Sequence, residues 1–419
     1  MSGGDILVGR QPIFDGDRSV HGYELVLVSE HPGGEGADAA EEGTPADRFL
    51  LTSAVVFGSL ELGVERFVGD RLMFCDASED LLHGETSPLV PPAQTVLEVP
   101  TAAVFGSGTA STVGPACHRL ARQGYGLALD GFRWFDGAEE MLPLFRYAKV
   151  DRRELGDGEL AEVVRGCRPF GTRVIVHPVD GPDDLRACEG LGADLYQGNL
   201  LLTPDPVEGR VLDPGQMASL RLAARLLDPD TGIAELEAIV RTDPTLSLQL
   251  MRMAAIGPPG RLRRTVSTVR EALVLVGWRR LQSWMSLLLF SGGGELSAEV
   301  LTAALVRARM CELLAPRVRS GSAEMAFTAG MLSILDVMLG VPLRDVVQHL
   351  PLAEDMRQAV LEHAGPVGQL LADVIDYQLG STGTARRCGL EPGALQLACF
   401  DALAWGIEVA TGLDASAMV

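Results

Sequence analysis

The chain has 419 residues, 47% of them hydrophobic and 22% charged, so it is long enough to form two or three domains with buried cores. Its formal net charge of −21 repels phosphate backbones and argues against direct nucleic-acid binding. The seven cysteines are widely spaced and form no CxxC pair, which argues against a disulfide framework or a zinc ribbon and fits a reduced, cytoplasmic setting.

Targeting and membrane signals are not evident in the sequence. The amino-terminal stretch MSGGDILVGRQPIFDGD has no basic region followed by an apolar one, so we expect no signal peptide. The apolar run SWMSLLLF at 283–290 is too short to cross a bilayer. We therefore expect a cytoplasmic protein that does not bind membranes.

Residues 5–205 alternate between short β-rich runs and helical stretches. The expected strands lie at 5–14, 71–77, 95–99, 126–132, 147–151, 173–179 and 194–198, and the expected helices at 47–60, 114–124, 156–167 and 181–192. Six or more successive βα units favour a mostly parallel sheet closed into a TIM-like barrel, with helices outside it. An acidic, glycine-rich stretch at 29–47 is expected to be a surface loop.

Polar residues stand at the carboxyl ends of these expected strands, where a barrel of this kind carries its site. A single polar residue at such an end is unremarkable, because strand ends meet solvent. The set as a whole predicts a functional site. Its members are Asp76, Glu98, Asp130, Lys149, Asp151, His177 and Gln197, and Lys149 is the only lysine in the chain.

From about residue 216 the apolar spacing changes to i, i+3, i+4, which is typical of helices alone. This pattern predicts an all-α helical bundle over 216–385. The stretch 206–215 is the expected linker, and 386–419 is expected to form a carboxy-terminal helix and tail. Within the bundle, Ser267 is the expected N-cap of the helix that begins TVREAL.

The strand-end residues lie in short sequence motifs that resemble those of EAL domains, the cyclic-di-GMP phosphodiesterase family. VGRQPIFDGDRSVHGYELVL resembles the family's opening, with YEL in place of Glu-Ala-Leu. TVLEV, LALDGF, AKVD and LYQGNLLLTP resemble four further motifs of the family, in the family's order. The resemblance implies that residues 5–205 form an EAL-type barrel.

EAL enzymes hydrolyse a phosphodiester with two metal ions, which activate water and hold the phosphate oxygens. The resemblance implies that Lys149 lies beside the attacking water and that Gln197 lies near the site. It implies metal-ligand roles for four acids, which are Glu24, Asp76, Glu98 and Asp130. These acids could hold one Mg²⁺ or Mn²⁺ ion at most, and no other cofactor is expected.

Three positions depart from the family's pattern. Val28 stands where the family has an arginine that contacts phosphate, and Gly131 replaces the second aspartate, a ligand of the second metal. His177 replaces a glutamate, and a lone histidine before Pro178 is more typical of a loop residue than of a metal ligand. These departures favour a degenerate phosphodiesterase domain, since single electrostatic groups of this kind are each worth roughly 10²–10³ in rate.

The words RTDPTLSLQLMRMA, TVSTVREALVLVGWRRLQ and AFTAGMLSILDVMLG resemble the HDOD family, a catalytically silent relative of HD phosphohydrolases. HD hydrolases bind metal through adjacent His and Asp, whereas the matching stretch here carries Ser333 and Ile334, with Asp336 nearby. We therefore expect the bundle to bind a protein partner. The candidate partner face is the basic stretch 260–280, although such arginines also suit a solvated helix face; they are Arg261, Arg263, Arg264, Arg279 and Arg280.

Three functions remain open on the sequence. The first is a non-catalytic signalling protein, made of a degenerate EAL-type barrel and an HDOD-type bundle, that acts through protein partners. The second is a cyclic-di-GMP phosphodiesterase with an altered metal site, and the third is a receptor that binds cyclic-di-GMP without cleaving it. Val28, Gly131 and His177 favour the first, whereas the retained acids and Lys149 keep the other two open.

Overall fold

A computed structural model gives the fold. It describes residues 7–28, 68–77, 90–105, 110–135, 137–202, 231–242, 268–277, 298–318, 323–348, 352–380 and 387–417, together with a few single positions between these ranges. The chain divides into two compact units, one built mainly on 1–203 and the other mainly on 204–375 and the carboxy-terminal helix. Each unit is described by itself.

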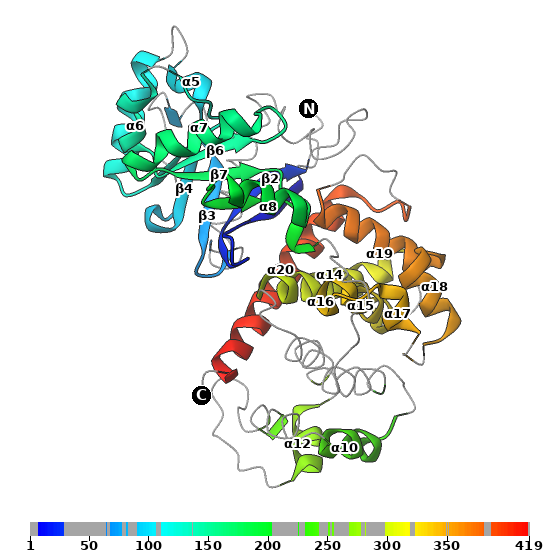
Figure 1. The fold of residues 1–419 in the computed structure, drawn as a ribbon. Helices are drawn as coiled ribbons and strands as arrows, with labels where there is room; N and C mark the ends of the chain where they lie inside the picture. The colour runs from blue at the N-terminus through cyan, green and yellow to red at the C-terminus, as the bar shows by residue number, and fades with distance from the viewer. Residues whose placement is uncertain are drawn as a thin grey trace. The chain divides into compact units, whose positions relative to one another are not determined.

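The amino-terminal unit is a closed barrel of eight strands (Figure 1). The strands follow one another around the barrel in chain order, and β8 closes onto β1. They are β1 (Leu7–Phe14), β2 (Val20–Val28), β3 (Leu72–Asp76), β4 (Thr95–Pro100), β5 (Gly126–Asp130), β6 (Tyr147–Asp151), β7 (Arg173–His177) and β8 (Leu195–Gln197). The TIM-like barrel expected from the βα pattern is present.

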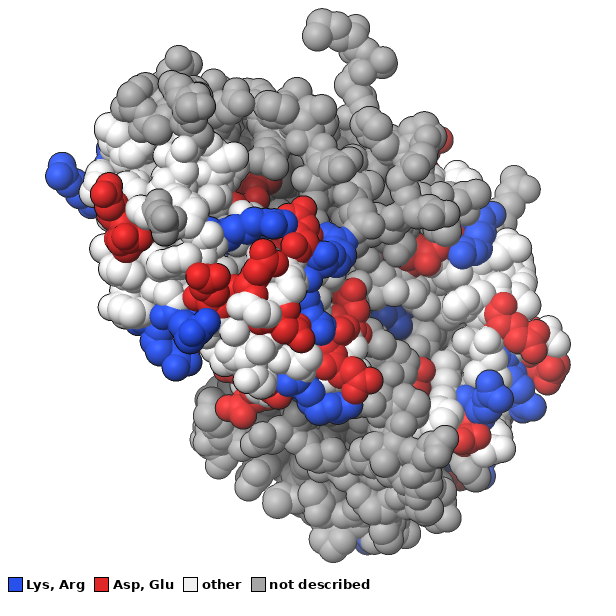
Figure 2. All heavy atoms as spheres, turned by 45° about the horizontal axis from the view of Figure 1, so that its top comes forward, with Lys and Arg blue, Asp and Glu red and all other residues white. Residues whose placement is uncertain are grey.

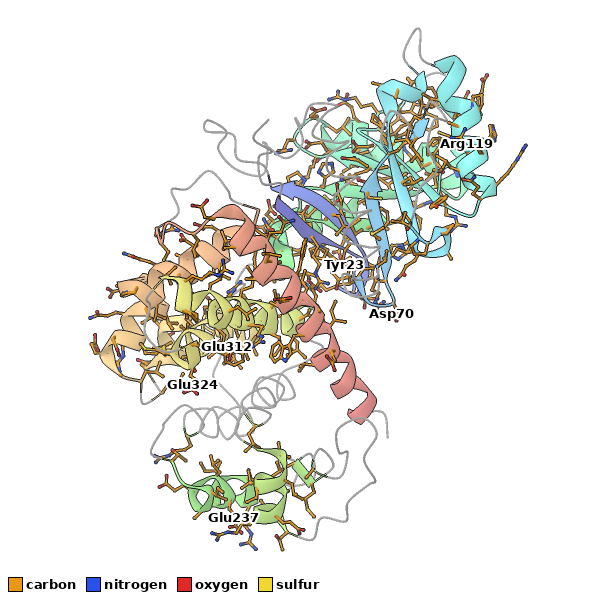
Figure 3. The ribbon with its side chains drawn as sticks, turned by 180° about the vertical axis from the view of Figure 1, so that it is seen from behind. Tyr23, Asp70, Arg119, Glu237, Glu312 and Glu324 are labelled. Atoms are coloured by element: carbon orange, nitrogen blue, oxygen red, sulfur yellow. The ribbon has the colours of Figure 1, made fainter. Side chains whose placement is uncertain are left out.

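The β1 strand differs from a regular βα barrel because it runs antiparallel to both of its neighbours, whereas β2 to β8 pair in parallel. A short turn, tightened by the Arg18 N–H that donates to the Asp15 carbonyl at 2.9 Å, joins β1 to β2. The strand pattern missed β2, because this strand follows the turn directly with no helix before it. On β2, the ring of Tyr23 (labelled in Figure 3) lies under the Arg10 guanidinium, 4.1 Å from ring centroid to guanidinium carbon.

Helices surround the parallel strands. They are α5 (Thr101–Phe105), α6 (Ala110–Arg122), α7 (Asp157–Cys167) and α8 (Pro182–Gly190). Inside the barrel, every strand except β2 contributes one side chain to a buried cluster, made of Ile13, Phe74, Val96, Ala128, Tyr147, Ile175 and Leu195. This apolar filling closes the barrel below the polar residues at the strand ends.

The second unit is helical in every part that the structure describes. Its helices are α10 (Ile233–Thr242), α12 (Val269–Val276), α14 (Ala298–Val318), α15 (Ala323–Leu332), α16 (Leu335–Leu339), α17 (Leu343–Val347), α18 (Glu354–Glu362), α19 (Gly365–Gln378) and α20 (Pro392–Ala417). The N-cap of α12 is Thr268, whose hydroxyl accepts from the Glu271 N–H at 3.1 Å, so the prediction of Ser267 was wrong by one residue. Arg309 of α14 pairs with Glu312 (labelled in Figure 3) and lies over the Trp405 ring of α20.

Several expectations fall on residues that the structure does not describe. These are the loop at 29–47, the helix at 47–60, the linker at 206–215 and the five arginines named for the partner face, whereas Arg270 of the same basic stretch is described. Among the described helices, none combines the length and the apolar composition needed to span a membrane. On the surface that is described, acidic and basic side chains are interleaved (Figure 2).

The loop after β5 is held by aromatic packing. Phe132 is fully buried, and its N–H donates to the Lys149 carbonyl at 2.8 Å. Phe135 packs edge-on against Phe105 of α5, with 4.5 Å between the ring centroids. Trp134 lies over Gly166 of α7, so closely that a Cβ at that glycine would overlap the indole ring. The loop that begins directly after Asp130 therefore has a defined path over two helices.

Gly166→Ala should destabilise the barrel by about 1–3 kcal/mol, because the added methyl displaces a packed indole. Gly158→Ala is the matched control, since Gly158 lies on the same helix and a Cβ there meets nothing within 4 Å. Urea unfolding of both variants measures the difference. Equal effects of the two substitutions would contradict the packing role of Gly166.

His21 and Tyr147 meet at the amino-terminal end of the barrel strands, with 2.8 Å between the imidazole Nε2 and the phenol oxygen. Burial, together with the charges of Arg173 and Arg71, lowers the pKa of His21 below its ordinary value of 6.5, although Asp15 opposes this shift. Below pH 6.5 the unfolded chain therefore takes up a proton that the folded chain resists. Stability is lost as the pH falls through this window.

His21→Gln removes this proton uptake. The stability advantage of the wild-type chain over His21→Gln should be largest above pH 7 and should shrink between about pH 6.5 and 5. Urea unfolding at a series of pH values measures it. An advantage that stays constant or grows in acid would mean that His21 is not held neutral in the folded barrel.

Candidate functional site

The residues predicted at strand ends lie there. Each of Asp76, Asp130, Asp151, His177 and Gln197 is the last residue of its strand. Glu98 and Lys149 lie two residues before the ends of β4 and β6 and are buried. Glu24 is the central residue of β2, opposite Gln11 of β1 and Phe74 of β3.

Lys149 is the centre of this group. Its Nζ lies 2.6 Å from Glu24 Oε2, to which it donates, and 3.7 Å from Glu98 Oε1. The lysine is only 5% exposed, so both interactions lie in a largely dry environment. Burial opposes a charge on Lys149, yet the carboxylates of Glu24, Glu98 and Asp130 raise its pKa well above the ordinary value. It is therefore a cation at any physiological pH.

Glu24 also receives a hydrogen bond from the Gln197 amide, so one carboxylate oxygen accepts from two donors. The same Gln197 nitrogen donates to Gln11 Oε1 at 2.7 Å. Gln11 was not predicted as a site residue from the sequence. Gln11 lies in the motif VGRQPIF, directly opposite Glu24 in the strand register. Burial would raise the pKa of Glu24, but the Lys149 charge and the hydrogen bonds from Lys149 and Gln197 outweigh burial and lower it.

Glu98 has the opposite environment. The side chain is 1% exposed, and neither of its oxygens has a hydrogen-bond donor when the group is ionised. Burial and the negative charge of Glu24 raise the pKa of Glu98 well above its ordinary value, despite the nearby Lys149. A protonated Glu98 can hydrogen-bond to Glu24, which further favours the ionised form of Glu24. The two glutamates of one site thus differ strongly in how their charge is balanced.

Asp76 and Asp130 lie at the same ends of their strands as this group. Asp76 is paired in register with Glu98, and both aspartates act electrostatically on Glu98. The acids Asp76, Glu98 and Asp130 are hard oxygen donors of the kind that Mg²⁺ and Mn²⁺ prefer. In the part of the chain that the structure describes, no three acids, histidines or cysteines already converge on one point as a metal site would.

The remaining predicted positions lie at or near the strand ends in other surroundings. Asp151 binds the Arg153 guanidinium, with 2.7 Å from Nη2 to Oδ2. Gly131 has a positive φ of 63°, and a Cβ there would meet nothing within 4 Å. His177 is buried at the end of β7, and Val28 pairs with Leu7 in the backbone register.

Cys75, next to Asp76, is a core residue. Its side chain is buried in β3, and burial together with the charges of Asp76, Glu98 and Glu24 raises its pKa far above the ordinary value. A thiol in such a place is not an effective nucleophile, because the thiolate is the reactive form.

In the helical unit, the stretch that matches the HD motif holds Ser333, and an arginine of α14 binds this serine. The Arg307 Nη1 donates to the Ser333 hydroxyl at 3.0 Å, and that hydroxyl donates to the Gly330 carbonyl at 2.8 Å. Arg307 is buried, and burial lowers its pKa to about 10, so it remains charged. Burial raises the pKa of Asp336, whose Oδ1 accepts from the Val337 N–H.

Comparison with known proteins covers both units. The HDOD domain family model matches residues 216–349. Cyclic di-GMP phosphodiesterase CdgJ of Vibrio cholerae is 29% identical over 373 residues, which cover 87% of this chain and 83% of CdgJ. These matches give residues 216–349 an HDOD domain match and give the chain as a whole a similarity to CdgJ. The amino-terminal unit is a closed barrel, and the residues of its EAL-like motifs gather at one end of it.

Two further proteins are similar to this chain. The uncharacterized protein YuxH of Bacillus subtilis is 25% identical over 377 residues, which cover 87% of this chain and 89% of YuxH. Among solved structures, BlrP1 of Klebsiella pneumoniae, in a complex with calcium and cyclic-di-GMP, is 18% identical with a TM-score of 0.38. That overlap covers 49% of this chain and 57% of the BlrP1 chain.

Because Lys149 is the only lysine, its burial can be measured chemically. An N-hydroxysuccinimide acetate should modify the folded chain at the amino terminus alone, and the denatured chain at Lys149 as well. Intact-mass spectrometry counts the labels and peptide mapping locates them. Labelling of Lys149 in the folded chain at the rate seen in urea would contradict the closed arrangement around Glu24.

Proposed function

We propose that this protein belongs to cyclic-di-GMP signalling, that its barrel hydrolyses the nucleotide weakly or not at all, and that it acts through protein partners. One observation carries the proposal. Glu24, which matches the glutamate of the EAL motif, already accepts hydrogen bonds from Lys149 and Gln197 on one oxygen. The Glu24 carboxylate, which would be a metal ligand in an EAL enzyme, thus has its charge compensated by the Lys149 ammonium and the Gln197 amide.

The departures from the family's pattern support the part of the proposal that says catalysis is weak or absent. Two-metal hydrolysis needs ligands for both ions, and Gly131 supplies no carboxylate for the second one. Val28 offers no guanidinium to a phosphate group, and arginine is the residue suited to that contact. On this proposal Lys149 and Gln197 keep their places at the site while their catalytic roles are relics.

The donor set fits one divalent cation better than two. Glu98 has two buried oxygens without donors, and Asp76 and Asp130 end the neighbouring strands, so these three acids would hold the ion. A bound Mg²⁺ or Mn²⁺ would polarise a phosphate oxygen and activate water. Lys149 would then orient Glu24, and Gln197 would hold Glu24 and Gln11 in register across β8, β1 and β2.

The helical unit is proposed to bind the partner. We assign 5–205 to the EAL-type barrel, 206–215 to a linker, 216–385 to an all-α HDOD-type bundle and 386–419 to a carboxy-terminal helix and tail. The HD position is filled by the Arg307–Ser333 pair, which has no metal-binding chemistry of its own. The basic stretch that includes Arg263 and Arg279 remains our candidate for the partner face.

The second candidate function is a cyclic-di-GMP phosphodiesterase with an altered metal site, or a receptor for the same nucleotide. The relative CdgJ carries the name of a phosphodiesterase, which favours this candidate. The convergence of Glu24, Lys149, Glu98 and Gln197 is also compatible with an intact nucleotide pocket.

Titration calorimetry with cyclic-di-GMP in Mg²⁺, Mn²⁺ or Ca²⁺, followed by chromatography of the products, tests the proposal. We expect no linear dinucleotide above the background of the Glu24→Ala variant, because the site lacks ligands for a bridged metal pair. Glu154→Ala, which alters an exposed ion pair with Arg133, is the matched control for the loss of an acid.

Three results are distinguishable. Product that Glu24→Ala abolishes and Glu154→Ala retains would overturn the proposal and establish the phosphodiesterase. Micromolar binding without product would favour the receptor. The absence of both binding and product would leave protein partners as the route of signalling.

A further inference from the structure

We propose that Lys149 is the resident cation of the barrel site, which occupies on Glu24 the place of a metal ion and lets the barrel fold without one. A corollary is that any divalent ion enters on the side of Glu98. The proposal concerns the folding of the barrel, so it stands apart from nucleotide binding and turnover.

The hydrogen bonds of Glu24 are the first support. Glu24 Oε2 accepts from Lys149 Nζ at 2.6 Å and from the Gln197 amide nitrogen. That amide is fixed in turn by Gln11 Oε1 at 2.7 Å, so the donors reach Glu24 from β6 and from β8. A metal ion on this oxygen would have to displace both donors, and one of them is itself a cation.

Burial makes this cation essential to the barrel. The side chains of Lys149, Glu24 and Glu98 are 6%, 12% and 1% exposed. Among described residues, Lys149 is the only basic side chain within 4 Å of either glutamate. A buried ion pair that loses one partner leaves an uncompensated charge in a low dielectric, which is strongly destabilising.

Neighbouring arginines do not take over this role, because they pair with other acids. Arg152 Nη1 lies 2.5 Å from Asp184, and Arg153 Nη2 lies 2.7 Å from Asp151. Both arginines follow Lys149 within four residues on the loop after β6, and they pair with acids at the end of β6 and on α8, whereas the lysine pairs with the buried glutamates.

The two glutamates differ in whether their carboxylate oxygens are free to bind a metal ion. Both oxygens of an ionised Glu98 are without donors, and Lys149 remains 3.7 Å away from it. Asp76 is paired in register with Glu98, and Asp130 ends the adjacent β5 strand. A divalent ion would therefore find its oxygen donors on β3, β4 and β5, away from the Glu24 oxygen that Lys149 and Gln197 occupy.

Thermal unfolding of the full chain, in 1 mM EDTA or in 1 mM MnCl₂ with no nucleotide, tests the proposal. In EDTA, Lys149→Met should lower the melting temperature by roughly 5–10 °C, because Glu24 loses its counter-charge. MnCl₂ should restore much of that loss, since the ion then takes the place of the ammonium. The wild-type chain should gain less from MnCl₂ than Lys149→Met does, since in the wild type the ion can add only on the side of Glu98.

Two further variants separate charge from packing. Glu24→Gln/Lys149→Met removes both charges of the pair, so it should melt in EDTA closer to the wild type than Lys149→Met does. Arg133→Met is the matched control, since it removes a cation from an exposed ion pair with Glu154, and it should change neither the melting temperature nor its response to MnCl₂ by more than about 2 °C.

The result that overturns the proposal is specific. Lys149→Met that melts with the wild type in EDTA, or wild type that gains as much from MnCl₂ as Lys149→Met does, would show that the lysine is not the resident cation. A double variant no more stable than Lys149→Met would mean that the loss is one of packing. If Lys149→Met fails to fold in EDTA while the double variant folds, the proposal is supported.

Discussion

A single buried ammonium group organises the polar end of this barrel. Eight strands that close in chain order bring four acids from β2, β3, β4 and β5 to the same end of the barrel. Like charges gathered in this way repel one another, and they do so strongly where solvent is excluded. Lys149, on β6, lies 2.6 Å from Glu24 and 3.7 Å from Glu98, and it is the charge that makes the cluster compatible with a folded barrel.

The single lysine of the sequence is consistent with this constraint. An ammonium is a compact point charge on a flexible stem, whereas a guanidinium is planar and larger. The chain uses arginine everywhere else, including Arg152 and Arg153 at the rim of the same strand, where the partners Asp184 and Asp151 are more exposed than Glu98. The interior position alone retains the smaller cation.

The barrel could be predicted from the sequence because its βα units repeat. The strand-end residues could be predicted because each is a polar residue that directly follows an apolar run. The sequence pattern missed β2, which follows its turn without a helix, and it missed Gln11, since a glutamine inside a strand has no distinctive pattern. It could not distinguish Glu24 from Glu98. Two carboxylates that look alike in sequence differ here only in the donors that folding brings to them.

The second unit also has a buried cation. The stretch that matches the metal-binding His-Asp of HD hydrolases carries Ser333, and the buried guanidinium of Arg307 donates to its hydroxyl at 3.0 Å. The two cations have different partners, because Lys149 faces two carboxylates and Arg307 faces a hydroxyl. A domain that depends on a bound metal ion folds only where the ion is supplied. On our proposal the barrel does not have this dependence, because Lys149 balances Glu24 whatever the supply of metal.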